Sequence, residues 1–213
     1  TSQIPDLGSA GIDARRLFTG SRFAIGTSAA RFVAITAIMA SLKDVFGLSN
    51  EQVGWIGGAG LWGFTITMLI FGSLCEVLGM KLVLRLAVLS HLAGALLMIL
   101  AGGFVTLFVG SLLLSMGDGL VQAACNPLAA TLYPDRKTEM FNKLHLWFPA
   151  GIVIAGLTAY GLTQTAPEYW QAKLVLILVP AAAYGVLFWG QQFPATERVQ
   201  SGVSFGEMFR ETF

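Results

Sequence analysis

Residues 53–74 read VGWIGGAGLWGFTITMLIFGSL and contain no charged side chain. A helix needs roughly 20 apolar residues to cross the hydrocarbon core of a bilayer, and this run is long enough. The whole chain has the same character, since 55% of its residues are hydrophobic, only 12% are charged and its mean hydropathy is +0.70. A soluble domain usually carries about 25% charged residues. The sequence therefore predicts an integral membrane protein that lies in the lipid bilayer.

Five more apolar segments accompany this one, and the connections between them are short. They predict an all-α membrane protein whose spans lie at 23–42, 53–74, 82–101, 104–132, 141–163 and 170–190. We accordingly divide the chain into a cytoplasmic N-terminal segment at 1–20, a six-helix transmembrane bundle at 21–192 and a C-terminal segment at 193–213.

The two terminal segments differ from the bundle. The chain begins with Thr1 and not with methionine, so we expect residues before it, and residues 1–20 lack the apolar core of a signal peptide. In the C-terminal segment, Phe205, Met208 and Phe209 are apolar at helical spacing among charged residues. This pattern predicts a cytoplasmic amphipathic linker helix at the membrane surface, from which we expect the chain to continue.

Basic residues indicate the orientation in the membrane. If the N-terminus is cytoplasmic, ten of the 13 lysines and arginines lie on the cytoplasmic side. Only Lys43 and Lys173 then lie outside, and Arg31 lies within the first span. Cytoplasmic loops carry an excess of Lys and Arg. We therefore expect a multi-pass protein of the cell (inner or plasma) membrane with both termini in the cytoplasm.

Several functional classes are disfavoured. The net charge of +1 indicates no nucleic-acid partner. Cys75 and Cys125 are far apart, and no cysteine–histidine cluster exists, so neither a disulfide framework nor a metal site is predicted. No nucleophile–base pairing and no phosphate-binding loop appears, which argues against an enzyme. No cofactor is predicted.

Small residues recur on two spans at spacings that favour close helix packing. The second span carries Gly54, Gly57, Gly58, Gly60 and Gly63, and the fifth carries Gly151, Ala155 and Ala159. Such residues let helix backbones approach closely within a membrane. We interpret both sets as packing surfaces, although glycine is also generally common in membrane helices.

The connection at 72–81, GSLCEVLGMK, resembles the loop signature of the major facilitator superfamily, G-x-L-x-D-x-x-G-R-K. The matching positions are Gly72, Leu74, Gly79 and Lys81. Glu76 stands in place of the usual Asp, and Met80 replaces the first basic residue. The resemblance implies a conformational latch formed by Gly72, Glu76, Gly79 and Lys81 on the cytoplasmic side.

The fourth span adds a second resemblance. Residues 117–127, GDGLVQAACNP, are similar to the fourth helix of the fucose and glucose/galactose symporter branch of that superfamily, where a Glu-x-x-x-Asn-Pro run is typical. Gln122 occupies the acidic position, and Asp118 lies one turn earlier as a candidate replacement. The resemblance implies that the chain forms one half, a 3+3 repeat of six helices, of a twelve-helix facilitator fold.

Polar residues within the spans are the candidate site, because charges inside a membrane are costly and often functional. Ser111, Ser115, Asp118, Gln122 and Asn126 recur at steps of three and four, which places them on one helix face. Helical rise places Arg31, Asp118 and His145 at similar depths. We expect an Arg31–Asp118 pair near the solute path, with His145 beside it.

Structural alternatives accompany each of these roles. Arg31 can extend towards the headgroups, and Asp118 can belong to an internal hydrogen-bond network. Gln122 and Asn126 suit either hydroxyl-rich solutes or bonds between helices. His91, in the middle of the third span, is expected to make a structural hydrogen bond. Two prolines, Pro127 and Pro149, are expected to permit bending.

The sequence supports two functional hypotheses. The first is a secondary active transporter that moves a small polar solute, with a sugar as one candidate, by alternating access and with coupling to H⁺ or Na⁺. It needs a second six-helix half in the same chain or a partner subunit. The alternative is a non-transporting accessory subunit built from half a facilitator fold, in which His91 or His145 would be free to ligate a haem or pigment.

Overall fold

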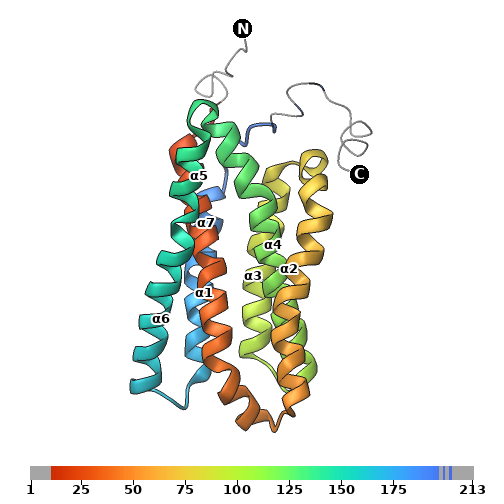
Figure 1. Ribbon diagram of the computed structural model, residues 1–213, viewed down its shortest axis with the longest axis vertical. Helices are drawn as coiled ribbons and strands as arrows, with labels where there is room; N and C mark the ends of the chain where they lie inside the picture. The colour runs from red at the N-terminus through yellow and green to blue at the C-terminus, as the bar shows by residue number, and fades with distance from the viewer. Residues whose placement is uncertain (1–10, 197–198, 200–201, 203–213) are drawn as a thin grey trace.

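The computed structural model describes residues 11–196, 199 and 202. Figure 1 shows the elements, which are α1 (Ala14–Phe46), α2 (Asn50–Leu78), α3 (Met80–Ile99), α4 (Phe104–Leu132), η1 (Pro134–Arg136), α5 (Lys137–His145), α6 (Trp147–Thr165), η2 (Trp170–Leu174) and α7 (Val175–Phe188). Within the described residues, six helical segments are long and apolar enough to cross a membrane. One of them combines η1, α5 and α6, and another combines η2 and α7. The all-α membrane fold expected from the sequence is confirmed.

Helix α1 begins well before the expected span at 23–42. Asp13 accepts a hydrogen bond from the backbone N–H of Arg16 at 2.9 Å and so caps the helix. The first turns then bury Leu17 and Phe18, although exposed Arg15 lies beside them. A search for long apolar runs finds only the lipid-embedded centre of such a helix, because its polar first turns lower the local hydropathy.

The fifth span is interrupted at its cytoplasmic end. The expected helix at 141–163 instead consists of α5, which ends at His145, and α6, which begins at Trp147. Pro149 has no N–H group to donate to the carbonyl oxygen of His145, and this missing bond ends α5. Helical bonds on either side, from Leu146 to Asn142 and from Ala150 to Leu146, keep the two helices continuous.

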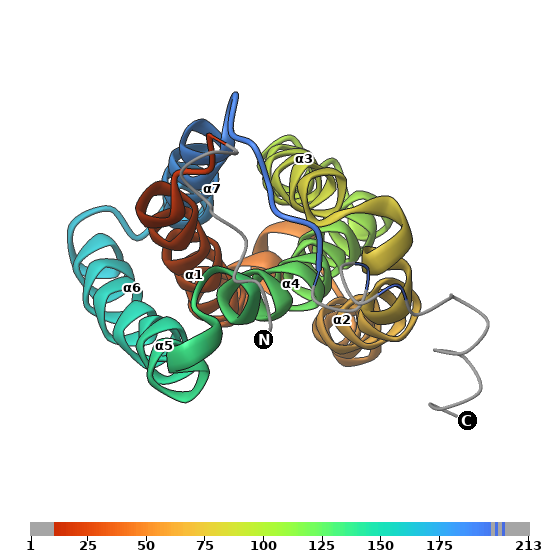
Figure 2. The ribbon, with the colours of Figure 1, turned by 90° about the horizontal axis from the view of Figure 1, so that it is seen from above.

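The helices form two groups of three spans. Figure 2 shows α1, α6 and α7 on one side and α2, α3 and α4 on the other. Helix α1 packs on α6 and α7, and α4 packs on α2 and α3. The groups meet where α1 approaches α4 and where α3 approaches α7. Residues from α1 and α4 therefore face one another in the interior of the bundle.

The outer surface of the bundle is apolar. Leu61 is 71% exposed, Leu69 is 74% exposed and Leu157 is 69% exposed. A water-soluble domain normally keeps contiguous apolar patches small, whereas a bilayer solvates such side chains. The interior holds two apolar clusters, one around Tyr184 and Leu84 and the other around Ile38 and Leu107.

Glycines allow the helices of the second group to approach closely. A Cβ atom on Gly63 of α2 would lie 2.7 Å from the carbonyl oxygen of Leu112 on α4. A Cβ atom on Gly94 of α3 would lie 2.8 Å from the backbone nitrogen of Leu114. In the first group, a Cβ atom on Gly151 would lie 2.8 Å from the Cβ atom of Ala29. No room remains for side chains at these positions, as expected for Gly63 and Gly151.

The chain after α7 crosses the end of the bundle. The ring of Phe193 contacts Phe188 with 5.5 Å between centroids, and Phe193 to Thr196 are not helical. Val199, which is helical, and Gly202 are also described, whereas the rest of the expected amphipathic linker helix at 193–213, including Phe205, Met208 and Phe209, lies outside the described residues. Residues 1–10 of the expected N-terminal segment also lie outside them.

Candidate functional site

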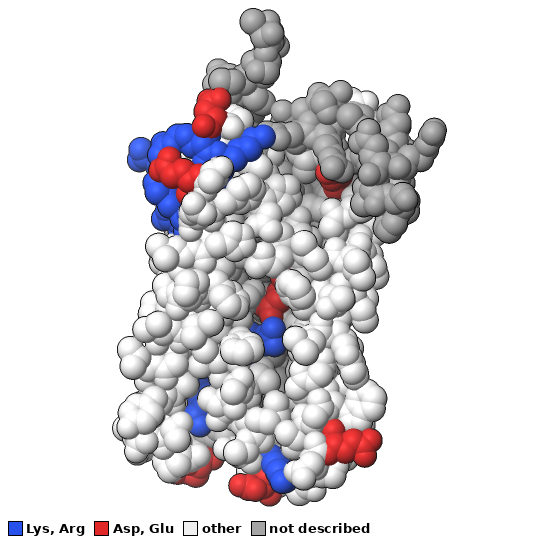
Figure 3. All heavy atoms as spheres, in the orientation of Figure 1, with Lys and Arg blue, Asp and Glu red and all other residues white. Residues whose placement is uncertain are grey.

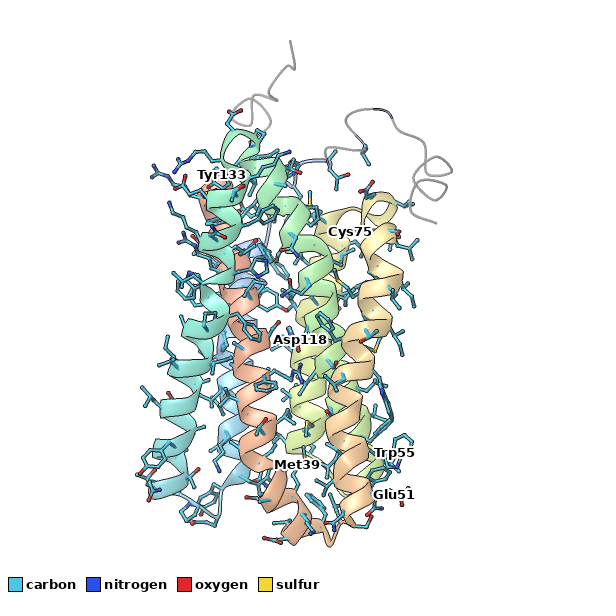
Figure 4. All side chains as sticks on the ribbon, in the orientation of Figure 1. Met39, Glu51, Trp55, Cys75, Asp118 and Tyr133 are labelled. Atoms are coloured by element: carbon cyan, nitrogen blue, oxygen red, sulfur yellow. The ribbon has the colours of Figure 1, made fainter. Side chains whose placement is uncertain are left out.

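A cavity of about 550 Å³ lies between the two helix groups. Its lining residues are Ser28, Arg31, Phe32, Gly60, Leu61, Phe64, Thr65, Asp118, Gln122, His145, Phe148 and Pro149. Figure 4 shows Asp118 near the middle of the bundle, between the ends marked by Tyr133 and Glu51. Figure 3 shows red and blue atoms in contact near the middle of a largely white flank. The cavity therefore brings charged groups together near the middle of the bundle.

Arg31 of α1 and Asp118 of α4 form an ion pair beside this cavity. Arg31 Nε donates to Asp118 Oδ2 at 2.7 Å, and Arg31 Nη2 lies 2.5 Å from the same oxygen. The two side chains are 13% and 3% exposed, so Arg31 does not extend to the headgroups. A Cβ atom on Gly60 would lie 2.9 Å from Arg31 Nη1. The glycine thus makes room for the guanidinium group.

The other oxygen of Asp118 belongs to a buried hydrogen-bond chain. His91 Nε2 on α3 lies 3.0 Å from Asp118 Oδ1, and His91 Nδ1 lies 2.8 Å from the hydroxyl of Tyr184 on α7. An ionised carboxylate only accepts, so Nε2 donates to Asp118, and a neutral ring then accepts at Nδ1 from Tyr184. His91 is fully buried. It makes the expected hydrogen bond, but its partner is the central acid of the candidate site.

Sequence reasoning did not connect His91 with Asp118. The packing depends on Gly117, where a Cβ atom would lie 2.6 Å from the ring carbon Cδ2 of His91. The sequence contained two signals, which are the histidine within the third span and the glycine next to Asp118 in the fourth. Neither one indicates from sequence alone which faces of α3 and α4 meet.

A second polar chain connects α4 with α5. Asn126 Nδ2 donates to Gln122 Oε1 at 3.3 Å, and His145 Nε2 lies 3.1 Å from Asn126 Oδ1. Gln122 and His145 line the cavity, whereas Asn126 lies behind them and is not part of its lining. The interhelical alternative considered for Asn126 is therefore present in the structure through His145. The bond of Gln122 stays within α4, and its side chain lies on the cavity wall.

The remainder of the polar stripe on α4 connects helices instead of lining the cavity. Ser111 Oγ donates to the carbonyl oxygen of Ile56 at 2.8 Å, and Ser115 Oγ donates to that of Gly60 at 2.6 Å. Ser115 Oγ also accepts from the backbone N–H of Phe64 at 2.7 Å. These bonds hold α2 against α4. The stripe is thus divided into the two serines, which join helices, and Asp118 and Gln122, which line the cavity.

Ser28 of α1 is a cavity residue that sequence reasoning missed. Its hydroxyl is buried beside Asp118 and lacks a hydrogen-bond partner of normal geometry. Buried hydroxyl groups normally have a partner. Small hydroxyl residues are common within this helix, and nothing in their spacing distinguishes Ser28 from Ser21, which donates to the carbonyl oxygen of Leu17.

The expected latch residues lie at the junction of α2 and α3. Gly79 has φ = 79°, a backbone conformation that favours glycine, and it alone separates the two helices. Glu76 and Lys81 are half-buried near it, and Gly72 is exposed on α2. The role of these four residues as a conformational latch stays a prediction, because it concerns contacts with another half of a transporter.

Groups that would bind a metal ion do not gather in the described residues. No set of three or more His, Cys, Asp or Glu side chains among them is arranged to hold a metal ion. Cys75 and Cys125 are both buried and unpaired with each other.

Comparison with known proteins gives a consistent family. The sequence profile of the Major Facilitator Superfamily matches residues 23–211. The hexuronate transporter of Bacillus subtilis is 28% identical, with 69% of this chain and 35% of the relative covered. The cis,cis-muconate transport protein of Acinetobacter baylyi is also 28% identical, with 66% and 34% covered.

A solved structure shares the fold. The structure of the proton:xylose symporter XylE bound to 6-bromo-6-deoxy-D-glucose matches with a TM-score of 0.69 at 15% identity. The match covers 93% of this chain and 48% of XylE. The chain thus spans less than half the length of the relatives it matches. The finer resemblance to the fucose and glucose/galactose symporter branch stays a prediction.

Proposed function

Because the chain belongs to the major facilitator superfamily, we propose that it forms one half of a secondary active transporter for a small polar solute. The observation that carries this proposal is the cavity near the middle of the bundle with a buried ion pair on its wall. Buried charges within a membrane are costly, and a solute path is a common reason for their presence. Relatives named as hexuronate and muconate transporters support transport as the activity.

The mechanism follows from the position of the cavity. It is open on the flank where α1, α2, α4 and α6 contribute its lining, and a second six-helix half facing this flank would close it. Rocking of the two halves about the enclosed site would then expose the solute to each side in turn. We propose the second half as a partner of this chain, in the same polypeptide or in another subunit.

Coupling to an ion is the second part of the proposal. Asp118 lies on the cavity wall and is the acid nearest to Arg31. Proton binding to this carboxylate would release Arg31 for another partner, which links the charge state of the site to its occupancy. We favour H⁺ over Na⁺, because Arg31 and His91 already occupy both carboxylate oxygens and leave no oxygen cage for a sodium ion.

Counterflow in proteoliposomes tests the function. The complete protein should exchange internal unlabelled solute for external labelled solute, and Asp118→Asn should abolish proton-driven uptake while the protein still elutes as a folded species. Arg85→Gln is the matched control, because Arg85 is exposed on α3 away from the cavity. Full proton-driven uptake by Asp118→Asn would remove Asp118 from the mechanism. Absence of counterflow with every solute would favour the accessory-subunit alternative.

The orientation is proposed from the positive-inside bias. Basic atoms gather at the end of the bundle where the described chain begins (Figure 3). With native Cys75 and Cys125 replaced by Ala, an impermeant maleimide should label Glu51→Cys on intact cells, because Glu51 is exposed at the opposite end. It should label Asp135→Cys only after lysis. The reverse pattern would place both termini outside the cell.

A further inference from the structure

The free hydrogen-bonding groups of the cavity are mainly donors. Both oxygens of Asp118 already accept hydrogen bonds, and Oε1 of Gln122 accepts from Asn126. Among the described residues of the lining, four groups have no hydrogen bond of normal geometry, which are Nη1 of Arg31, the side-chain amide nitrogen of Gln122, Nδ1 of His145 and the hydroxyl of Ser28, which lies beside Asp118. Two of the four are purely donors, and the hydroxyl can donate as well as accept. The cavity therefore matches a solute that is rich in acceptors.

A sugar and a carboxylate differ in this respect. Each sugar hydroxyl both donates and accepts, so a sugar enclosed in this cavity would bring donors that find few free acceptors. Buried donors without partners weaken binding. A carboxylate brings only acceptors, and its two oxygens match the fork of an arginine. The sugar considered as a candidate from the sequence is therefore the less favoured class.

The position of Arg31 also suits an exchange of partners. Its Nε and Nη2 atoms face Asp118, while Nη1 lies over Gly60, a residue of the cavity lining. The side chain is 13% exposed, whereas Asp118 is 3% exposed, so the guanidinium is the more accessible partner of the pair. A ligand in the cavity reaches Arg31 without first displacing His91 from Asp118.

We propose that the transported solute carries a carboxylate that binds Arg31 and competes with Asp118 for it. This inference rests on the proposed function and names its substrate class. Ser28 and Gln122 supply further hydrogen bonds to the carboxylate from α1 and α4. His145 is an exposed residue of the cavity lining and can contact the remainder of the solute.

Charge balance gives the proposal a second consequence. Arg31 and Asp118 together are neutral, and a bound carboxylate would leave one uncompensated negative charge in a low-dielectric site. One proton taken from water restores neutrality, and the titratable groups around this position are Asp118 on α4, His91 on α3, Tyr184 on α7 and His145 of the cavity lining on α5. Cys125 of α4 also lies near Tyr184. Binding of one anion should therefore take up one proton.

Matched pairs of acids and neutral analogues test the substrate class. Binding of D-glucuronate against D-glucose, and of nicotinate against nicotinamide, is measured by calorimetry with the complete protein in detergent. At least one acid should bind at least about tenfold more tightly than its neutral analogue, because a charge-assisted hydrogen bond contributes more than a neutral one. Repetition in buffers of different ionisation enthalpy should give uptake of about one proton per acid bound.

Two variants attribute the preference to Arg31. Arg31→Gln should abolish the discrimination between acid and neutral analogue, and Arg31→Lys should keep part of it if Arg31→Gln does not fold. Arg85→Gln should behave like the wild type. The proposal is overturned if the neutral analogues bind as tightly as the acids, if no acid binds, or if Arg31→Gln keeps the preference. Counterflow of a neutral solute in the same preparation would then leave the proposed transport function intact.

Discussion

The ion pair between Arg31 and Asp118 predicts a strong thermodynamic coupling between the two residues. In Arg31→Gln, the carboxylate of Asp118 loses the bonds from Nε and Nη2 and keeps only the one from His91. It is 3% exposed, so water does not replace what is lost. Breaking a buried ion pair by removing one partner costs about 3–5 kcal/mol. We expect the free energy of unfolding to fall by this amount.

The double variant isolates the pair from other effects. When Asp118→Asn is added to Arg31→Gln, no uncompensated charge remains, and the two amides can bond to each other. We therefore expect the double variant to be more stable than Arg31→Gln alone. Its loss of stability should be smaller than the sum of the two single losses, with an interaction energy of about 1–3 kcal/mol.

Unfolding in detergent micelles provides the measurement. The complete protein is titrated with SDS, and tryptophan fluorescence reports the free energy of unfolding for the wild type, both single variants and the double variant. Arg85→Gln is the control and should change stability by less than about 0.5 kcal/mol. The reasoning would be refuted if the double variant lost as much stability as the two single variants together, or if Arg31→Gln lost no more than Arg85→Gln.

The buried chain behind Asp118 leads to two further predictions. His91→Phe removes the donor to Asp118 Oδ1 and the partner of Tyr184. We expect it to lower the free energy of unfolding by about 1–3 kcal/mol and to slow proton-driven uptake. Unchanged uptake in proteoliposomes would confine His91 to a structural role. Gly117→Ala places a methyl group 2.6 Å from the His91 ring, and in the same SDS titration it should lower the free energy of unfolding by about 1–3 kcal/mol. The control Gly54→Ala should leave stability nearly unchanged, because no atom lies within 4 Å of the added carbon.

The positions of the helices could be predicted well from the sequence, because each spanning helix needs about 20 apolar residues to cross the hydrocarbon core. Helix α4 covers the range expected for it, 104–132, since its ends coincide with the ends of the apolar run. The predicted start of α1 was wrong by several residues, because Asp13 and Arg16 form a polar first turn that hydropathy does not recognise as helix. The break before α6 was missed because Pro149 was interpreted as a bend within one helix.

The candidate site was less predictable because it depends on which helix faces meet. Helical spacing placed Ser115 and Asp118 on one face of α4, but it did not show that Ser115 contacts α2 while Asp118 faces α1. The identity of the partner of His91 required the packing of α3 on α4, which is set by glycines on both helices. Sequence periodicity gives the face of each helix and not its neighbour.

The network around Asp118 joins the two helix groups, and this placement has a mechanical consequence. One carboxylate on α4 holds α1 through Arg31 and, through His91 and Tyr184, also holds α7 of the same group. If a solute takes Arg31, the bond from α4 to α1 is lost while the bonds through α3 to α7 remain. Helix α1 is then the helix of its group that has lost its ion pair with α4, and it is also the one that contributes Ser28 and Phe32 to the cavity lining. Occupancy of the cavity would therefore be transmitted to the packing of the bundle through a single helix, because His91 keeps Asp118 fixed in place.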